Sequence, residues 1–271
     1  LNTVVHQEPA LAARACGVRV FVHARELPAC DPSLCEVLNA SPEQVRRHAL
    51  ASADVLIANS HYLAGFYQAP ECCVVPNVVV LEKFKVPMPN SEVLRVGMVS
   101  SNLPKKGLHD FVALARELEQ RQLPVACVLI GPDNTHVTAL KDSAQRGELP
   151  GNLEFAGYIP EPAEAMARLQ VVLNLSSFEE SFGRSVLEAM AAGRAVVCYS
   201  HGALPELVSE GETGYLVPRD VMAVADAVEQ LVRAPSKVRQ MGASGLSRVK
   251  TEYSVQVMAE RLSGCMNLEK N

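Results

Sequence analysis

The sequence predicts an α/β protein built around parallel strands, and two patterns lead to this prediction. Short apolar runs rich in β-branched residues alternate with longer stretches in which apolar residues recur at helical spacing. The runs are apolar at successive positions, so both faces of each strand are expected to be buried, as in parallel sheets covered by helices on both sides. Residues 108–121 show the helical spacing, with apolar side chains at positions 108, 111, 112, 114, 115 and 118.

Strands are expected at the apolar runs and helices between them. In chain order the expected strands are Thr3–Val5, Val18–Val22, Val55–Ala58, Val93–Val99, Val125–Ile130, Leu153–Phe155, Val171–Leu175, Ala195–Tyr199 and Tyr215–Val217. Three helical stretches then follow one another without a strand, and they are Val221–Arg233, Ser236–Thr251 and Val255–Asn267. The regular alternation before them supports the α/β class.

A linker is predicted at residues 83–92, a charged stretch that contains two prolines. It separates residues 1–85, with three or four expected strands, from residues 86–250, with five or six strand–helix alternations. The second part is long enough for a complete doubly wound, Rossmann-like domain, whereas the first is expected to be only part of one. Residues 251–271 are expected to form a C-terminal helix that packs back on the N-terminal part.

Composition and charge exclude other classes of protein. The chain has 271 residues, of which 48% are hydrophobic and 20% charged, an ordinary globular composition. Its formal net charge is −5 and it has no basic run, which argues against nucleic-acid binding. The sequence contains no run of about 18 apolar residues, so it predicts no transmembrane helix. The eight cysteines include no Cys-x-x-Cys, so reduced thiols in a cytoplasmic protein are expected rather than disulfides or a zinc site.

Motifs for the common cofactors are absent from the sequence. There is no Gly-x-Gly-x-x-Gly, no Gly-x-x-x-x-Gly-Lys-Ser/Thr and no His-Glu-x-x-His. There is also no Asp-x-Asp that would hold a divalent ion on a sugar diphosphate. We therefore expect no bound cofactor and no metal ion.

The most informative segment is 176–193, which follows the expected strand Val171–Leu175 and opens a helix near Gly183. A strand, a glycine-containing turn and a helix start together form an anion site, because free N–H groups and the helix dipole face the turn. Glu188 lies in the second turn of that helix among apolar residues, where a carboxylate is costly unless it is hydrogen-bonded. A vicinal diol such as that of a ribose would satisfy it; the alternative is a surface residue on an alanine-rich helix.

The same segment resembles the signature of retaining GT-B glycosyltransferases of family 4. Glu180 and Glu188 have the family's spacing, with Phe182-Gly183 between them and Glu-Ala-Met-Ala-Ala-Gly at the end. Further motifs match in order over residues 1–260: Val74–Asn77 with Phe84, Val96–Gly97 through Lys106–Gly107, Leu129–Pro132, Phe155–Gly157, Leu204–Glu206 and Gly211–Val217. The resemblance implies a GT-B-like fold of two Rossmann-like domains, the N-terminal one partial here.

The resemblance also implies roles for residues on the donor side. Glu188 would bind the donor ribose, Gly183 would meet the diphosphate, and Lys106 would neutralise it as it departs. The nucleobase would lie by Gly157, Tyr158 and Ile159, and the donor would also meet Ser101, Asn102, Ser181, Phe182 and Arg184. A Lys-Lys-Gly such as that ending at Gly107 is otherwise a solvated helix start.

On the acceptor side, His23 ends the strand Val18–Val22 and resembles the histidine that faces the donor sugar in the family. Without the family context, a histidine in that place is most often a core or surface residue. Glu180 would contact hydroxyls of the transferred sugar, so His23, Glu180 and Lys106 are the implied catalytic residues. Glu8 and Glu26 are the acidic candidates beside the acceptor.

One departure from the family lies in the loop after Val96-Gly97. The family commonly carries an arginine a few residues before the lysine, whereas residues 98–104 contain none. Ser100, Ser101 and Asn102 would donate neutral hydrogen bonds there, or Arg184 would supply the charge. Charged hydrogen bonds contribute roughly 1.5–3 kcal/mol against about 1 kcal/mol for neutral ones, so the departure bears directly on the leaving group.

The resemblance implies transfer of a sugar from a nucleotide diphosphate sugar to an acceptor hydroxyl, with retention of configuration, in polysaccharide or glycoconjugate biosynthesis. The acceptor would be a glycan, a lipid-linked molecule or a small molecule, and the location cytoplasmic or peripheral to the inner face of a membrane. The alternative is a nucleotide-sugar-binding module without transferase activity. A glycogen-phosphorylase-like function has less support, since no lysine context for a pyridoxal cofactor is apparent.

The small N-terminal part leads to a further expectation. Three or four strands are few for a doubly wound domain, so the chain is expected to be an N-terminally truncated enzyme. A parallel sheet cut in this way exposes a strand edge, and association through that incomplete sheet is expected.

Overall fold

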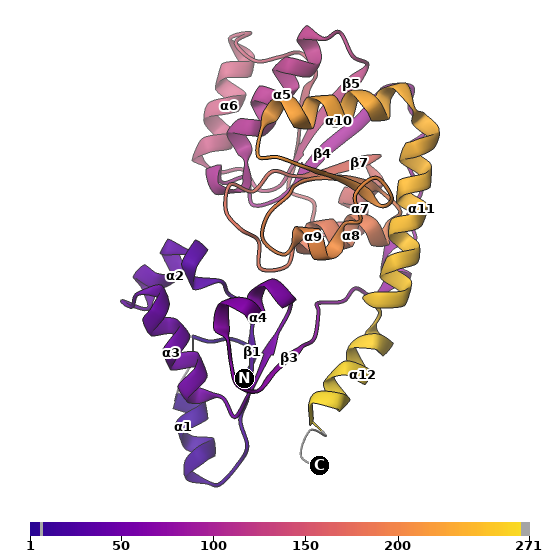
Figure 1. Ribbon diagram of the computed structural model, residues 1–271. Helices are drawn as coiled ribbons and strands as arrows, with labels where there is room; N and C mark the ends of the chain where they lie inside the picture. The colour runs from indigo at the N-terminus through magenta and orange to yellow at the C-terminus, as the bar shows by residue number, and fades with distance from the viewer. Residues whose placement is uncertain (6–7, 267–271) are drawn as a thin grey trace. The chain divides into compact units, whose positions relative to one another are not determined.

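The computed structural model describes residues 1–5 and 8–266, which form two compact α/β units (Figure 1). The first unit comprises Leu1–Val78, Glu179–Phe182 and the described residues from Val255 onward. The second comprises Val79–Phe178 and Gly183–Ser254. Each unit has its own parallel sheet, as the alternation of strands and helices predicted.

The second unit, described throughout, contains a six-stranded parallel sheet. Its strands are β4 (Leu94–Val99), β5 (Val125–Ile130), β6 (Leu153–Gly157), β7 (Val171–Asn174), β8 (Ala195–Tyr199) and β9 (Gly214–Val217). Their order in the sheet is β6-β5-β4-β7-β8-β9. The first strand of the unit is therefore central, and the direction of winding reverses between β4 and β7, which is the doubly wound arrangement.

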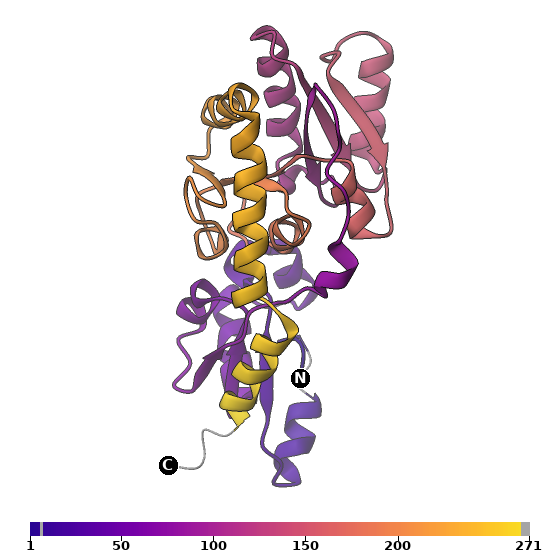
Figure 2. The ribbon, with the colours of Figure 1, turned by 90° about the vertical axis from the view of Figure 1, so that its right-hand side faces the viewer.

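Helices cover this sheet, and the longer ones carry one apolar stripe each. They are η2 (Leu81–Phe84), η3 (Pro104–Lys106), α5 (Leu108–Gln120), α6 (Thr135–Gln145), α7 (Pro162–Ala167), α8 (Arg184–Ala191), α9 (Leu204–Leu207), α10 (Val221–Arg233) and α11 (Pro235–Glu252). One core joins alternate strand residues to α5 and α10, through side chains such as Phe111 and Leu231. Helix α8 contacts β7 and β8, and the long helix α11, the upright gold helix in Figure 2, packs against α8.

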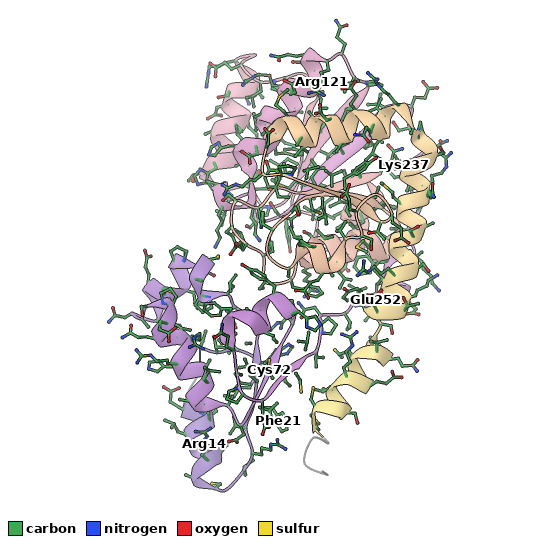
Figure 3. The ribbon with its side chains drawn as sticks, in the orientation of Figure 1. Arg14, Phe21, Cys72, Arg121, Lys237 and Glu252 are labelled. Carbon is green, nitrogen blue, oxygen red and sulfur yellow. The ribbon has the colours of Figure 1, made fainter. Side chains whose placement is uncertain are left out.

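Ion pairs fix α5 against α10, and α5 begins directly beside the candidate site. Arg121, labelled in Figure 3, lies at the end of α5. It donates to Glu117 Oε1 and Asp226 Oδ1, each at 2.7 Å, and to Glu229 Oε2 at 2.8 Å. These carboxylates come from two helices, so the guanidinium joins α5 to α10.

The expected linker lies on the second unit and is held there by a buried arginine. Arg194 donates to Pro87 O at 2.6 Å and to Met166 O at 2.9 Å. Burial lowers the pKa of Arg194 to about 10, which leaves the guanidinium protonated at neutral pH.

The first unit contains a three-stranded parallel sheet, in the order β1 (Phe21–Ala24), β2 (Val55–Ala58) and β3 (Cys72–Val74). Its helices are α1 (Glu8–Ala15), η1 (Pro28–Cys30), α2 (Pro32–Val37), α3 (Pro42–Ser52), α4 (His61–Tyr67) and α12 (Val255–Met266). Val22 and Leu56 pack on one side of the sheet with the core of α3 and α4. Ile57 and Cys73 pack on the other side with α12.

Two expectations about the first unit are wrong. Residues 3–5 form no strand. Thr3 instead directs its hydroxyl to Glu26, and Leu1 O accepts from the amide of His23 on β1. The strand β3 was not expected, because it is three residues long and consists of two cysteines and a valine. The expected end of the last helix at Asn267 lies outside the described residues.

Candidate functional site

The site of the second unit lies where β4 and β7 end, at the point where the strand order reverses. Ligands of doubly wound folds bind at that place, outside the carboxyl ends of the strands. Ser101, Asn102 and Lys106 lie in the loop and 3₁₀ turn that follow β4, and Gly183 lies after β7. The structure therefore brings these four predicted donor residues to one edge of the sheet.

Asn102 shapes the loop after β4 from inside the protein. It is 1% exposed and adopts a left-handed backbone, with φ of 55°. Its side chain donates to Pro132 O at 3.3 Å, and its amide donates to Ser100 Oγ at 3.0 Å. The neighbouring Ser101 is exposed, and its carbonyl accepts from Asn134. The geometry favours a structural role for the Asn102 side chain and leaves Ser101 accessible.

Gly107 allows the two loops of the site to approach each other closely. Its φ is +86°, and a Cβ at this position would lie 2.1 Å from Leu175 O, at the end of β7. The amide of Ser177 also donates to Lys105 O at 2.9 Å. The turn that carries Lys106 is thus fixed to the loop after β7.

Lys106 lies in that turn, directly before α5 begins. Its Nζ is 4.5 Å from the centroid of the Phe178 ring, at cation–π distance. Lys105 Nζ lies 5.7 Å from the same centroid. Phe178 was not predicted as a site residue, although it lies two residues before Glu180; an aromatic residue in an anion-binding turn was the available signal.

Gly183 begins α8 with a backbone that only glycine adopts readily. Its φ is +96°, and an added Cβ would lie 2.5 Å from Leu204 Cδ2. Gly107 is the N-cap of α5 in the same way. A glycine N-cap has no side chain to occupy the first N–H groups of its helix, and neither helix has a side-chain cap. Both helices therefore place positive dipole ends at this edge of the sheet.

Glu188 is 7% exposed, so the alternative of an ordinary surface residue is wrong. Its Oε1 accepts from Arg184 Nε at 2.8 Å. Arg184 is therefore paired with Glu188, the residue predicted to bind the ribose, which lies one helical turn away.

The predicted nucleobase segment follows β6. Gly157 has φ of +72°, with open space where a Cβ would be, and its carbonyl accepts from the amide of Gly131 at 3.0 Å. Tyr158 is 67% exposed and Ile159 is half-buried. An exposed aromatic ring and backbone groups are available here for a planar base.

In the first unit, His23 lies on β1 beside Ile57 of β2. Its Nε2 is buried and has no hydrogen-bond partner among the residues that the structure describes. Burial, and then the charge of Arg25, lower the pKa of His23 below its ordinary value, while Glu26 acts in the opposite direction. The imidazole is therefore neutral at neutral pH, with one nitrogen unsatisfied.

The two acidic acceptor-side candidates differ in their surroundings. The carboxylate of Glu26 accepts from Thr3 Oγ1 at 2.7 Å and from the amide of Arg25 at 3.1 Å. Glu8 is exposed in the first turn of α1. Glu26 thus helps to shape the chain after β1, and Glu8 is accessible.

The segment Glu179–Phe182, which holds Glu180, Ser181 and Phe182, belongs to the first unit. Ser181 Oγ donates to Arg25 O at 2.9 Å, and Ser60 Oγ donates to Ser181 O at 2.7 Å. The Tyr62 hydroxyl donates to the Glu179 carboxylate. Sequence reasoning missed Ser60, Tyr62 and Glu179; a serine and a tyrosine at the helix start after β2 were the available signal.

The described residues contain neither a metal-binding cluster nor a membrane-spanning helix. No group of three or more histidine, cysteine, aspartate or glutamate side chains could hold a metal ion there. Likewise, no helix within residues 1–5 and 8–266 is long and apolar enough to cross a membrane.

Two α/β units with parallel sheets, the second of them doubly wound, give a GT-B-like fold. Solved structures share it. Anabaena Alr3699/HepE, solved in complex with UDP and glucose, matches with a TM-score of 0.78 at 21% identity, over 95% of this chain and 74% of that one. Sucrose-phosphate synthase from Thermosynechococcus elongatus matches with a TM-score of 0.78 at 20% identity, over 96% and 71%.

The family model of glycosyl transferases group 1 matches residues 81–248, and the chain belongs to this family. The resemblance to GT-B glycosyltransferases is thereby confirmed at the level of the family, and retention of configuration stays a prediction. Among curated relatives, glycogen synthase of Mycobacterium tuberculosis is 30% identical over 172 residues, which is 62% of this chain and 40% of the relative. Phosphatidyl-myo-inositol mannosyltransferase of the same species is 28% identical over 202 residues, 69% and 52% respectively. The chain spans about half the length of these relatives or less.

Proposed function

We propose that the protein transfers a sugar from a nucleotide diphosphate sugar to an acceptor hydroxyl, with retention of configuration and without a metal ion. One observation carries the proposal: at the switch point of the second sheet, Lys106, two glycine-capped helix starts and the buried Glu188 lie at one edge. Membership of the glycosyl transferases group 1 family supports it. The UDP and UDP-glucose named for the Anabaena structures support a nucleotide-sugar donor.

The chemistry required at this edge is the stabilisation of negative charge on a departing diphosphate. Groups that are already oriented towards the developing charge stabilise it without having to reorganise. Lys106 supplies a full positive charge, and the first N–H groups of α5 and α8 supply donors and dipole ends. In this proposal these groups replace a divalent cation.

Glu188 binds the ribose in this proposal, with its carboxylate accepting from the two hydroxyls of the diol. A buried carboxylate near a diphosphate would repel it if its charge were uncompensated. The guanidinium of Arg184 at 2.8 Å offsets that repulsion. Arg184 thus contributes through Glu188 and does not stand in for the arginine missing from the loop after β4.

His23 and Glu180 act on the transferred sugar. His23 is neutral, and its buried Nε2 has no hydrogen-bond partner among the described residues, which suits contact with a sugar hydroxyl. Glu180 would accept from other sugar hydroxyls. Retention of configuration rests on the resemblance of residues 180–188 to the signature of retaining transferases.

The proposal includes an acceptor and a location. The named relatives include a glycogen synthase and a phosphatidyl-myo-inositol mannosyltransferase, in keeping with a glycan, a lipid-linked molecule or a small molecule beside Glu8 and Glu26. The cytoplasmic location is proposed from the sequence, whose eight cysteines include no Cys-x-x-Cys and are expected to be reduced.

A second candidate function is nucleotide-sugar binding without transfer. The observation that favours it is the three-stranded sheet of the first unit, against six strands in the second. The two candidates agree on donor binding and differ only in turnover.

The test is calorimetric titration with uridine, guanosine, adenosine and thymidine diphosphates in EDTA, followed by assays of donor hydrolysis and transfer. Saturable binding of at least one nucleotide with release of sugar supports the transferase. The anomeric configuration of the product, read by NMR, decides whether configuration is retained. Nucleotide binding without turnover would support the nucleotide-sugar-binding module. If none of the nucleotides binds, both candidate functions are overturned.

A further inference from the structure

Helix α4 of the first unit holds the segment Glu179–Phe182 through two hydroxyl groups. Ser60, the N-cap of α4, donates from Oγ to Ser181 O at 2.7 Å. Tyr62, in the first turn of the same helix, donates to the carboxylate of Glu179. The residues on both sides of Glu180 are therefore hydrogen-bonded to one helix start.

The Ser60 hydroxyl is well suited to this contact. Its oxygen accepts from the amide of Leu63 at 3.0 Å, as an N-cap does, which directs its proton away from the helix and towards Ser181 O. Ser181 in turn donates from its own Oγ to Arg25 O at 2.9 Å, two residues after His23. The segment is thus tied to the chain that follows β1 as well as to α4.

The Glu179 carboxylate has two neutral donors. Burial, and the hydrogen bond to Glu179, raise the pKa of Tyr62 above its ordinary value. The same two causes raise the pKa of the Cys30 thiol, whose Sγ lies 3.4 Å from Glu179 Oε2. Both groups therefore stay protonated and continue to donate across the physiological pH range.

We propose that Tyr62 and Ser60 are positioning residues for sugar transfer, which hold the side chain of Glu179 and the carbonyl of Ser181 on the two sides of Glu180 so that its carboxylate meets the transferred sugar. The proposal rests on the proposed function and adds to it the residues that set the geometry of Glu180. The predicted nucleotide contacts in the second unit, at Lys106 and Glu188, do not involve these bonds. Loss of the bonds should therefore affect the sugar of the donor and leave the nucleotide unaffected.

The experiment compares Tyr62→Phe with the wild-type chain in three measurements: Kd for the nucleoside diphosphate, Kd for the corresponding nucleotide sugar, and kcat of donor turnover. We expect the Kd for the nucleotide sugar to rise by about 3- to 10-fold and kcat to fall by a similar factor, as for one lost hydrogen bond. The Kd for the nucleoside diphosphate should change by less than about twofold. A general loss of structure would weaken both ligands together.

Two further variants make the test specific. Tyr67→Phe is the matched control, because it removes a tyrosine hydroxyl of the same helix that donates to Glu26 O and not to residues 179–182. Glu179→Ala removes the carboxylate that accepts the hydrogen bond from Tyr62. Glu179 is exposed, so this change leaves no cavity. If the bond carries the effect, the double variant Tyr62→Phe with Glu179→Ala should be no worse than either single variant.

The outcomes separate this proposal from the proposed function. If the wild-type chain binds and turns over donor, but Tyr62→Phe matches it or Tyr67→Phe produces the same loss, the positioning role is overturned. If the wild-type chain neither binds nor turns over any donor, the proposed function fails. In that case, amide hydrogen exchange at residues 179–182 still tests whether Tyr62 holds the segment. Exchange should be faster in Tyr62→Phe than in the wild-type chain, and equal rates would overturn the positioning role.

Discussion

Arg184 Nε donates to Glu188 Oε1 at 2.8 Å across one turn of α8, and the two side chains differ greatly in exposure, 68% against 9%. The carboxylate is thus held in place from the solvent side while it remains buried. Such a pair contributes little to stability, because its cationic partner is solvated. Its value lies in fixing the orientation of Glu188 and in compensating its charge.

Replacement of Glu188 tests the ribose assignment. Glu188→Gln keeps the size of the side chain but turns one acceptor oxygen into a donor. It should weaken ribonucleoside diphosphates by about 10- to 150-fold, as for one or more charged hydrogen bonds, and should affect inorganic pyrophosphate little. Calorimetry checks both ligands. Equal affinity of the wild-type protein for 2′-deoxy and ribo forms would show that the diol assignment is wrong.

The close contact at Gly107 predicts a large effect of a single methyl group. Gly107→Ala places Cβ against Leu175 O and forces a left-handed backbone, so it should cost more than about 3 kcal/mol of the free energy of unfolding. Gly211→Ala is the control, since φ is +74° there but the space is open, and the cost should be about 1–2 kcal/mol. Urea denaturation measures both. Equal losses would contradict the close approach of the two loops.

The lowered pKa of His23 predicts a dependence of stability on pH. The unfolded chain binds a proton at His23 more readily than the folded chain does, because burial and Arg25 disfavour the imidazolium. The contribution of His23 is fully present above the unfolded pKa of about 6.5 and is lost as the pH falls through the folded value. Wild type should therefore lose stability relative to His23→Gln between about pH 7 and pH 5. Parallel curves for the two proteins would contradict the burial of a neutral imidazole.

Metal dependence separates this mechanism from that of transferases which bind the diphosphate through a divalent ion. Lys106 and the two helix starts supply the positive charge in our proposal, so EDTA should leave both donor binding and turnover unchanged. The measurement is a titration with and without Mg²⁺ or Mn²⁺ after treatment with EDTA. Strict dependence on either ion would mean that the site works in another way.

The strands of the second unit could be predicted because their sequences leave little choice. Val125–Ile130 and Ala195–Tyr199 are apolar at every position, and runs of this kind are stable only between two layers of helices. By contrast, β3 is a short strand that contains two cysteines, and residues 3–5 look like a strand but lack a partner strand. The local pattern of apolar residues therefore identifies long buried strands. It fails for short segments, whose pairing into a sheet depends on the neighbouring strands.

The same limit applies to the site. Gly183 and Glu188 could be chosen from the sequence because a glycine turn and a carboxylate on an apolar helix each need a physical reason. The burial of Asn102 could not, since it depends on Pro132, which lies 30 residues away in the sequence. The bonds from Ser60 and Tyr62 to residues 179–181 join positions more than 100 residues apart. Contacts of that range come from the topology and not from any local motif.

The central claim is that the edge of the second sheet at β4 and β7 binds a nucleoside diphosphate through Lys106. The most direct measurement is a calorimetric titration of wild type, Lys106→Ala and Lys105→Ala with the nucleoside diphosphate that binds, in the absence of metal. We predict that Lys106→Ala weakens binding by about 10- to 150-fold, as for a charged hydrogen bond, and that Lys105→Ala changes it by less than about threefold. Less than a threefold change in Lys106→Ala would contradict the claim.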